Sequence, residues 1–402
     1  MNPLPVVKAT IRGNRVTFAL FTVLVALAVA LGVAITAQER ALRQGSARAV
    51  DRFDLLVAAP GSQTDIVLAA IFLQPSAVEL IPGPTLAKLL AEPRATLSAP
   101  IAFGDNHRGI QVIGTTAAFT EHLSGGLAEG RIFARRSEAV VGAAVDLPIG
   151  HRFRAAHGHA SAADGSMDEH GLESEIVGRM KPTASPWDRA IVVPVEHNWE
   201  VHGLPTGHPK GSEAIGPPYD PALLPGAPVV VMRPESVAAA YGLRNRYRTA
   251  ATAAFFPAEV LTQLYGVMGD VRRVMDYLTA ATQVLVILAI IAGVVALMDL
   301  YRRRFAVLRA IGASREFILL TIWLYLGAIV TGGTALGLLL GIGLAEAVSA
   351  ALAAETGVVF APRIGGAEVA LAGIVLGLGL LLALLPALAQ YRRPAIEGLK
   401  GG

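Results

Sequence analysis

The sequence predicts an α-helical membrane protein with four transmembrane helices, both termini in the cytoplasm, and a large extracytoplasmic mixed α/β domain between the first and second helices. Hydrophobic residues make up 53% of the 402 residues and charged residues only 16%, whereas soluble globular chains carry roughly 25% charge. The apolar residues gather in four long runs, and arginines cluster near the ends of these runs. The runs predict the membrane helices, and the arginines predict their orientation.

Each apolar run is long enough for a helix to cross the hydrocarbon, which takes about 20 residues. The predicted spans are residues 16–37, 277–300, 317–345 and 369–389. Basic residues precede the first run, as they do in a signal peptide. This run is longer than a signal core, however, and no clean small-residue cleavage site follows it. We therefore expect the first helix to be retained.

Basic residues near the span ends set the orientation. They lie before the first span, between the second and third, and after the fourth: Lys8, Arg12, Arg15, Arg302, Arg303, Arg304, Arg309, Arg315, Arg392, Arg393 and Lys400. An amphipathic N-terminal helix (1–15), the segment 301–316 and a C-terminal tail (390–402) are therefore predicted to be cytoplasmic. Residues 38–276 and a short loop, 346–368, which has no positive excess, then lie outside.

The spans themselves have no ionisable residue in their middle. Charges inside a membrane mark proton and ion pathways, so a proton relay or an ion-coupled carrier is not indicated. Glycines recur instead at four-residue spacing in the third span (Gly333, Gly337, Gly341) and in the fourth (Gly373, Gly377). Small residues at this spacing allow helix backbones to approach closely, although glycine is also common throughout this chain.

The external domain alternates short strand-like and helix-like segments. Residues 53–58, 109–114, 138–141, 174–178, 190–194 and 229–232 resemble strands, and residues 65–72 and 85–92 resemble helices. The Pro/Gly-rich residues 204–228 predict a loop. The turn at Trp187, Asp188 and Arg189 fits either a partner-binding turn or a structural turn next to a strand.

Both ends of the external domain predict helices that continue into the membrane. Residues 39–52 keep a helical composition beyond the first span. Before the second span, apolar residues follow a four-three heptad spacing: Val260, Leu264, Val267, Val271, Val274 and Leu278. This spacing is typical of a coiled-coil seam and equally of an ordinary core-facing helix. We favour a rigid helical stalk.

No enzyme motif is present. A phosphate-binding loop needs a Gly-Lys pair, and the chain contains none; it also lacks the His-Glu-x-x-His and Gly-x-Ser-x-Gly motifs. The absence of cysteine excludes thiolate metal sites and disulfides. The charge pattern does not favour nucleic-acid binding. We therefore expect a non-catalytic chain, and any ATP hydrolysis must be supplied by another subunit.

Histidine is the unusual chemical feature, since all nine lie between His107 and His208. Six have carboxylates nearby in sequence and are candidate zinc ligands: His151, His157, His159, His170, His197 and His202. Imidazole and carboxylate suit zinc, but the spacing fits no defined zinc motif. The composition of residues 151–171 predicts a flexible loop, so these are either solvated loop histidines or a site that senses or collects metal.

The arginine-rich turn between the second and third spans predicts a short amphipathic helix at the membrane surface. Its apolar residues can face the membrane while its arginines reach cytoplasm or lipid phosphate, and Gly312 allows a tight exit into the third span. The segment contains Arg302, Arg303, Arg304, Phe305, Val307, Leu308, Arg309, Ala310, Ile311, Gly312, Ala313 and Ser314, and the family resemblance given below implies that these residues contact a cytoplasmic ATPase.

This arrangement resembles the MacB/FtsX-like permeases, including the LolC/LolE-like ones, which are membrane subunits of mechanotransmission-type (type VII) ABC transporters. The matching residues are 5–15 at the N-terminus, the Arg-Arg-x-x-x-x-Leu-Arg-Ala-x-Gly-Ala-Ser segment at 302–314 and the Pro-x-x-x-x-Leu ending at 394–399. Many members carry a Glu soon after the arginine pair, where this chain has Arg304 and Phe305. Pieces of the external domain, among them Gly104-Asp105-Asn106, resemble one subgroup that is loosely associated with metal supply.

The resemblance implies a permease in a bacterial inner membrane with its large domain in the periplasm. Its partners would be a cytoplasmic ABC ATPase dimer of LolD or MacB type that holds ATP and Mg²⁺, a second copy of itself or a paralogous permease, membrane lipid, and a periplasmic adaptor or binding protein. Such a subunit would export, extract or release a cargo on the outer side. The alternatives are an FtsX-like regulator of a periplasmic enzyme, or a zinc-linked binding or sensing module.

Overall fold

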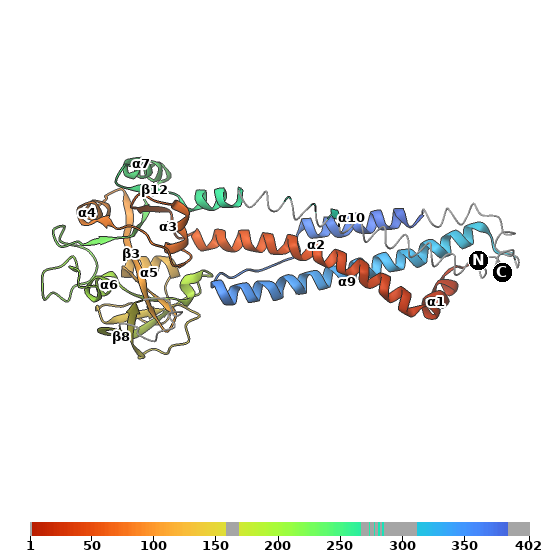
Figure 1. Cartoon of the computed structure of the whole chain (residues 1–402), viewed down its shortest axis with the longest axis horizontal. Helices are drawn as coiled ribbons and strands as arrows, with labels where there is room; N and C mark the ends of the chain where they lie inside the picture. The colour runs from red at the N-terminus through yellow and green to blue at the C-terminus, as the bar shows by residue number, and fades with distance from the viewer. Residues whose placement is uncertain are drawn as a thin grey trace. The chain divides into compact units, whose positions relative to one another are not determined.

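The computed structural model describes residues 2–157, 169–266 and 312–384, together with residues 273, 277, 280, 281 and 284. The chain divides into two compact units. We call Met1–Leu42, Met268–Ala351 and Phe360–Gly402 the helical unit, and Arg43–Val267 and Leu352–Val359 the sheet unit. Most of the predicted second span and residues 301–311 lie outside the described residues (Figure 1).

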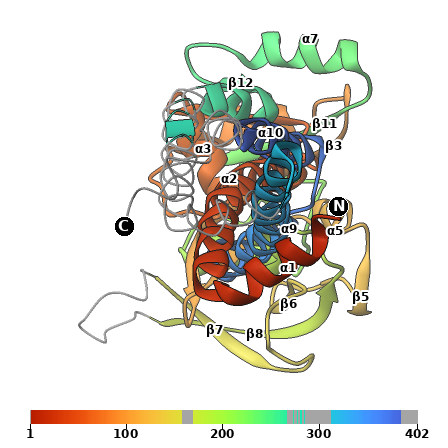
Figure 2. The same cartoon turned by 90° about the vertical axis from the view of Figure 1, so that its right-hand side faces the viewer.

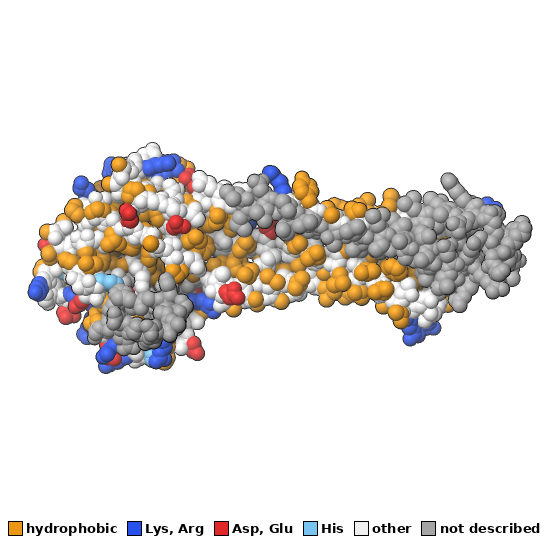
Figure 3. All heavy atoms as spheres, in the orientation of Figure 1, with side chains coloured by type: hydrophobic (Ala, Val, Ile, Leu, Met, Phe, Trp, Pro, Cys, Tyr) orange, Lys and Arg blue, Asp and Glu red, His pale blue; other side chains and the backbone are white. Residues whose placement is uncertain are grey.

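The helical unit contains α1 (Leu4–Gly13), most of α2 (Arg15–Val50), most of α9 (Arg315–Thr356) and α10 (Gly366–Leu382). These helices lie side by side in the end-on view of Figure 2. Within the described residues, α2 and α9 are long and apolar enough to cross a membrane, and α10 is a shorter apolar helix. Apolar side chains cover much of the described helix surface (Figure 3), as membrane helices require because lipid tails surround them.

Helix α9 is longer than expected. Residues 346–356 belong to the predicted external loop, but they continue the helix to Thr356. Five of these residues are alanines, which favour helix strongly. The helix ends at Gly357, whose φ of 74° is the left-handed conformation that glycine adopts at helix ends.

The sheet unit is built on a ten-stranded mixed sheet with the order β12-β1-β11-β3-β4-β9-β6-β8-β5, in which β7 pairs with β3 and β8. The strands β4 and β9 and the strands β6 and β8 run parallel, and the other pairs are antiparallel. The strands are β1 (Leu55–Ala58), β3 (Ala95–His107), β4 (Ile110–Thr115), β5 (Leu127–Gly130), β6 (Glu138–Val141), β7 (Arg152–His157), β8 (Glu169–Met180), β9 (Ile191–Pro194), β11 (Val229–Pro234) and β12 (Ala253–Phe255), with β2 (Ile81–Pro82) and β10 (Gly226–Ala227) in a separate pair.

Short helices connect or follow these strands. They are α3 (Gln63–Ala70), α4 (Gly83–Leu90), α5 (Ala117–Ser124), the 3₁₀ turn η1 (Pro186–Arg189), α6 (Val195–Val201), α7 (Val237–Tyr247) and a helix over residues 257–266. Three of them begin at a hydroxyl side chain that accepts a hydrogen bond from a backbone N–H of the first turn: Ser62, Thr116 and Ser236. Such caps satisfy N–H groups that have no partner inside the helix.

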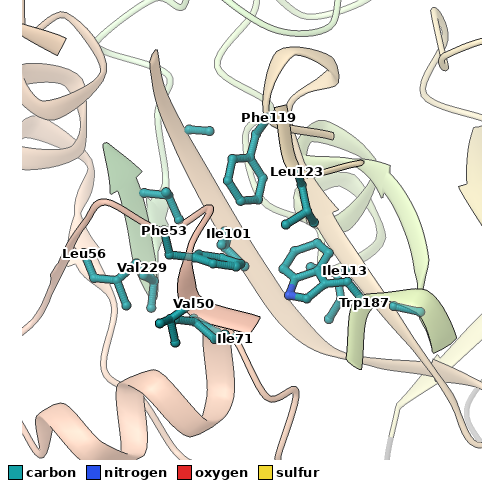
Figure 4. Packing of buried hydrophobic residues seen from close by; sticks show 14 of the residues in the cluster. Val50, Phe53, Leu56, Ile71, Ile101, Ile113, Phe119, Leu123, Trp187 and Val229 are labelled. Carbon is teal, nitrogen blue, oxygen red and sulfur yellow. The ribbon is translucent and has the colours of Figure 1, made fainter. Parts of the chain in front are cut away.

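An aromatic cluster lies in the main core of the sheet unit (Figure 4). The ring of Phe119 is 5.5 Å from that of Phe53 and 5.8 Å from that of Trp187, both in edge-to-face contact. Trp187 is fully buried, and the Asp188 carboxylate accepts backbone N–H bonds from Thr183 and Ala184 at 2.7 and 2.8 Å. These contacts favour a structural turn here over a partner-binding one.

Residues 151–171 are not the continuous flexible loop that their composition predicted. Strand β7 takes up residues 152–157 and β8 begins at Glu169, while residues 158–168 lie outside the described part. Phe153 and Ala155 are buried beside Ile176 of β8. Alternating buried side chains therefore hold this segment in the sheet, although its small and polar residues gave only a weak strand signal.

Candidate functional site

A glycine seam joins α2 and α9 within the helical unit. A Cβ atom added at Gly333 would lie 2.5 Å from Cβ of Val25, one at Gly337 would lie 2.6 Å from the Ala26 carbonyl oxygen, and one at Gly341 would lie 2.7 Å from Cβ of Val33. Larger side chains would therefore force the two backbones apart. The seam places three predicted packing glycines at the closest approach of two helices.

Helix α10 also packs on α9. A Cβ atom at Gly379 would lie 2.7 Å from a methyl carbon of Val330, and the Trp323 indole N–H donates to the Leu380 carbonyl at 3.0 Å. Gly373 and Gly377, the predicted packing glycines of this helix, have no described atom within 4 Å of such a Cβ. Their packing role stays a prediction, since most of the second span is not described.

A partly buried ion pair connects α2 with the start of α10. One terminal nitrogen of Arg40 lies 2.6 Å from both carboxylate oxygens of Glu368, and the other donates to the Arg363 carbonyl at 3.2 Å. The Glu368 side chain is fully buried, and its carboxylate also accepts the Gly365 N–H at 2.8 Å. We call Arg40 and Glu368 the polar joint. Sequence reasoning missed it, because pairing across more than 300 residues leaves no local pattern.

A second polar contact joins α2 to α9. The Ser349 hydroxyl donates to the Gln38 side-chain oxygen at 2.9 Å. Gln38 lies two residues before Arg40, so α2 is bonded to both neighbouring helices over less than one turn. A hydrogen-bonded layer of this kind fixes the rotation of the three helices about their axes, which apolar packing alone leaves less defined.

The end of the predicted ATPase-contacting segment is described. Gly312 has a φ of 101°, a conformation that other residues rarely adopt. Ala313 is buried against the helical unit, and the Ser314 hydroxyl accepts the Phe317 N–H at 3.2 Å, which caps α9. Residues 302–311 lie outside the described residues, and their contact with an ATPase stays a prediction.

The sheet unit contains the beginning of the predicted stalk. Ala49 and Val50 of α2 share a core with Val260 and Leu261 of the helix over residues 257–266. The Arg43 guanidinium lies 5.5 Å from the centre of the Tyr265 ring. Leu264 is half-buried. The remaining stalk positions lie outside the described side chains: Val267, Val271, Val274 and Leu278.

The last residues of α9 dock on the turn η1 in the sheet unit. The Arg189 guanidinium donates to the Ala354 carbonyl. A Cβ atom added at Gly357 would lie 3.0 Å from both Pro186 and the Arg189 side chain. Residues 352–359 therefore belong to the sheet unit, although they lie far from its other residues in sequence.

The six candidate zinc histidines are spread over several elements. The His151 ring is 6.3 Å from that of His107. The buried His197 has its Nδ1 3.1 Å from the Arg136 carbonyl oxygen, and the His202 Nδ1 is 2.6 Å from that of Asn198. His157 and His170 lie in β7 and β8 with undescribed side chains, and His159 is undescribed. Among the described side chains, no group of three or more metal-ligating residues forms a metal cluster.

Comparison with known proteins identifies the class of the C-terminal part. Residues 278–396 match the family described as FtsX-like permease C-terminal. This confirms the predicted resemblance to FtsX-like permeases, which are membrane proteins, for that part of the chain. The matched residues include the undescribed arginine-rich turn, helix α9 and helix α10.

Other comparisons add little. No curated protein matches the chain. One solved structure that matches is the extracellular domain of the noncanonical ABC-type transporter YknZ from Gram-positive bacteria, at 13% identity and a TM-score of 0.27, covering 50% of this chain and 98% of that one. A similarity at this TM-score supports no conclusion about fold or function.

Proposed function

We propose that this chain is the permease subunit of an ABC transporter in which a separate cytoplasmic ATPase dimer drives movements on the outer side of the membrane. The family match to residues 278–396 supports the permease class. The observation that carries the mechanism is the glycine seam with the polar joint, because together they fasten α2, α9 and α10 into one rigid group.

In this mechanism the segment 302–314 sits in a groove of the ATPase. Closure of the ATPase on ATP displaces this segment, and the capped start of α9 at Ser314 moves with it. Because α9 is fastened to α2 and α10, the three helices move as a group rather than separately. The movement reaches the sheet unit through α2 and through residues 352–359, which belong to that unit.

The protein would work as a homodimer or with a paralogous permease, in contact with membrane lipid and an adaptor or binding protein outside. The described spans contain no central ionisable residue, so the work is done on the outer side and not through a polar channel. The movement either transports a cargo or activates an external enzyme. In both cases it begins at the segment 302–314.

The Leu308→Asp variant tests this input. A carboxylate at this position removes apolar contact with the ATPase groove and adds a charge that must be desolvated. We expect the variant to lose co-purification with the ATPase and at least tenfold of the stimulated ATP turnover. Leu204→Asp is the matched control, because Leu204 is an exposed leucine of the sheet unit. Unaltered ATPase binding and turnover in Leu308→Asp would show the proposal to be wrong.

A further inference from the structure

We propose that a cavity in the sheet unit binds an extended, uncharged peptide segment of another protein, which pairs its backbone with residues 76–79. The cavity lies between the segment 73–80 and the strands β3 and β4, and its volume is about 470 Å³. Ligand sites commonly have volumes of about 300–1,000 Å³. All of its lining residues belong to the sheet unit, so the site does not depend on the proposed ATPase coupling.

Residues 76–79 resemble an edge strand that has no partner strand. Ser76 and Val78 are half-buried, whereas Ala77 and Glu79 are exposed, which is the two-residue alternation of an extended chain. No backbone N–H or carbonyl of these four residues has a hydrogen-bond partner within the described part of the chain. An edge with open backbone donors and acceptors is a template for pairing with another chain. Recognition domains bind extended peptides in this way.

The lining of the cavity favours an apolar side chain. None of the described lining residues is ionisable. Ile113 of β4 is fully buried, and Phe103 of β3 and Val78 pack against the main core of the sheet unit. A charged group that entered this cavity would lose water without gaining an opposite charge. The bound segment is therefore uncharged where it meets the cavity.

One amide side chain in the lining is complementary to a peptide group. Gln111 of β4 is half-buried and lines the cavity, and its side chain makes no hydrogen bond to the described residues. An amide side chain has both an acceptor oxygen and donor N–H groups, and a peptide group offers the matching donor and acceptor. A few polar groups of this kind orient a ligand in a largely apolar site.

Backbone strain next to the segment 76–79 is a further sign of a ligand site. Leu73 lines the cavity and has a φ of 53°, a left-handed conformation that glycine usually supplies just after a helix. Glycine at this position would relieve the strain but would remove an apolar side chain from the lining. Strained residues of this kind are concentrated at ligand sites.

The test measures peptide binding to the full chain in lipid nanodiscs, where no detergent competes for the cavity. The probe is a capped hexapeptide of alternating serine and valine that carries an uncharged fluorophore, and fluorescence anisotropy reports its binding. We expect saturable binding of one peptide per chain. The absence of saturable binding would overturn the site.

An exposed leucine of the lining allows a variant that leaves the core intact. Leu80 lines the cavity and is 56% exposed. We expect Leu80→Asp to weaken peptide binding about tenfold, because a bound peptide would desolvate the new charge. Leu204→Asp is the matched control, since Leu204 is an exposed leucine outside the lining. Equal affinities of the two variants for the peptide would contradict the assignment.

Methylated peptides separate backbone pairing from apolar binding. Methyl groups on the backbone nitrogens of all serines, or of all valines, remove the N–H donors along one edge of the extended peptide and keep its side chains. We expect at least one of these two peptides to bind about tenfold more weakly than the parent peptide. Unchanged binding of both would show that the cavity takes apolar groups without strand pairing, and the proposal would be wrong.

The Leu308→Asp chain distinguishes this site from the ATPase coupling. Residue 308 lies outside the sheet unit, so this variant should bind the peptide as tightly as the parent chain, whatever its effect on the ATPase. A loss of peptide binding in Leu308→Asp would contradict the independence of the site.

Discussion

At the scale of single residues, the polar joint shows how a buried charge is held in place. The Glu368 carboxylate has no solvent exposure and accepts hydrogen bonds from the Arg40 guanidinium and the Gly365 N–H. Removing one partner of such a pair leaves an uncompensated charge, whereas removing both charges is much less costly. Comparing the stability of a variant that lacks one charge with that of a variant that lacks both therefore tests whether the pair is formed.

We expect Arg40→Ala to destabilise the protein by about 3 kcal/mol. The Arg40→Ala, Glu368→Gln double variant should recover part of this loss, because glutamine carries no charge and can still accept the Gly365 N–H. Thermal unfolding in detergent measures both variants. A double variant less stable than Arg40→Ala would contradict the buried pair.

The ionisation of Glu138 makes the stability of the sheet unit depend on pH. The Arg131 guanidinium donates to both of its oxygens at 2.6 and 2.7 Å, which lowers the pKa of Glu138 from 4.5 to about 2. A lowered pKa in the folded state stabilises the fold above pH 4.5, and this contribution is lost as the pH falls toward 2. Arg131 is 56% exposed, so solvent screening reduces the effect.

The Glu138→Gln variant should be less stable than the parent protein by about 1 kcal/mol at pH 7. The difference should shrink as the pH falls from 4.5 toward 2, because the parent loses the same interaction on protonation. Denaturation followed by tryptophan fluorescence at several pH values measures this. An equal difference at pH 7 and pH 3 would show that the ion pair is not its source.

At the scale of elements, the glycine seam predicts that the effect of a substitution in α9 depends on whether the residue faces α2. Gly341 faces α2, while Gly343 has no described atom within 4 Å of an added Cβ. Both lie in the same helix, so valine has the same effect on helix propensity at each position.

Gly341→Val should lower stability by about 1–3 kcal/mol through overpacking, and Gly343→Val should have a much smaller effect. Thermal unfolding compares the two directly, and ATPase stimulation by each variant shows whether the seam also transmits movement. Equal destabilisation by both variants would contradict the packing assignment, because valine has a higher helix propensity than glycine and loses nothing by that term.

Several elements were predictable because their signal is local. The strand at residues 138–141 matches β6 in both bounds, and the apolar runs near residues 16 and 317 became α2 and α9. Strand β3 was missed because Pro100 and Gly104 interrupt its pattern, although it pairs with β11, β4 and β7. The register with β4 shifts at a bulge between Ala102 and Asp105, which accommodates this irregularity. Hydrogen bonds to the neighbouring strands stabilise β3, and the local sequence gives no sign of them.

The ion pair of His202 with Asp105 shows the same limit. His202 stands out as a histidine near carboxylates, but Asp105, which lies 3.6 Å from its Nε2, has no feature in the sequence that marks it as a neighbour. It becomes one because α6 packs on β3 and β4. Long-range pairing of this kind follows from the topology of the sheet, which local patterns leave open.

At the scale of the whole molecule, the sheet unit is more than an insertion between the first two spans. Its residues come from Arg43–Val267 and also from Leu352–Val359. The chain therefore passes between the two units at four points, after residues 42, 267, 351 and 359. Both α2 and α9 are single helices that contribute residues to each unit.

The length of α9 has a mechanical consequence. A helix of 42 residues is about 63 Å long at 1.5 Å per residue, roughly twice the 30 Å thickness of the hydrocarbon. In the proposed permease, about half of α9 would extend beyond the lipid tails. A rod of this length that pivots by about 5° at one end displaces the other end by about 5 Å. A small rotation at Ser314 thus becomes, at Thr356, a displacement about as large as one helical turn.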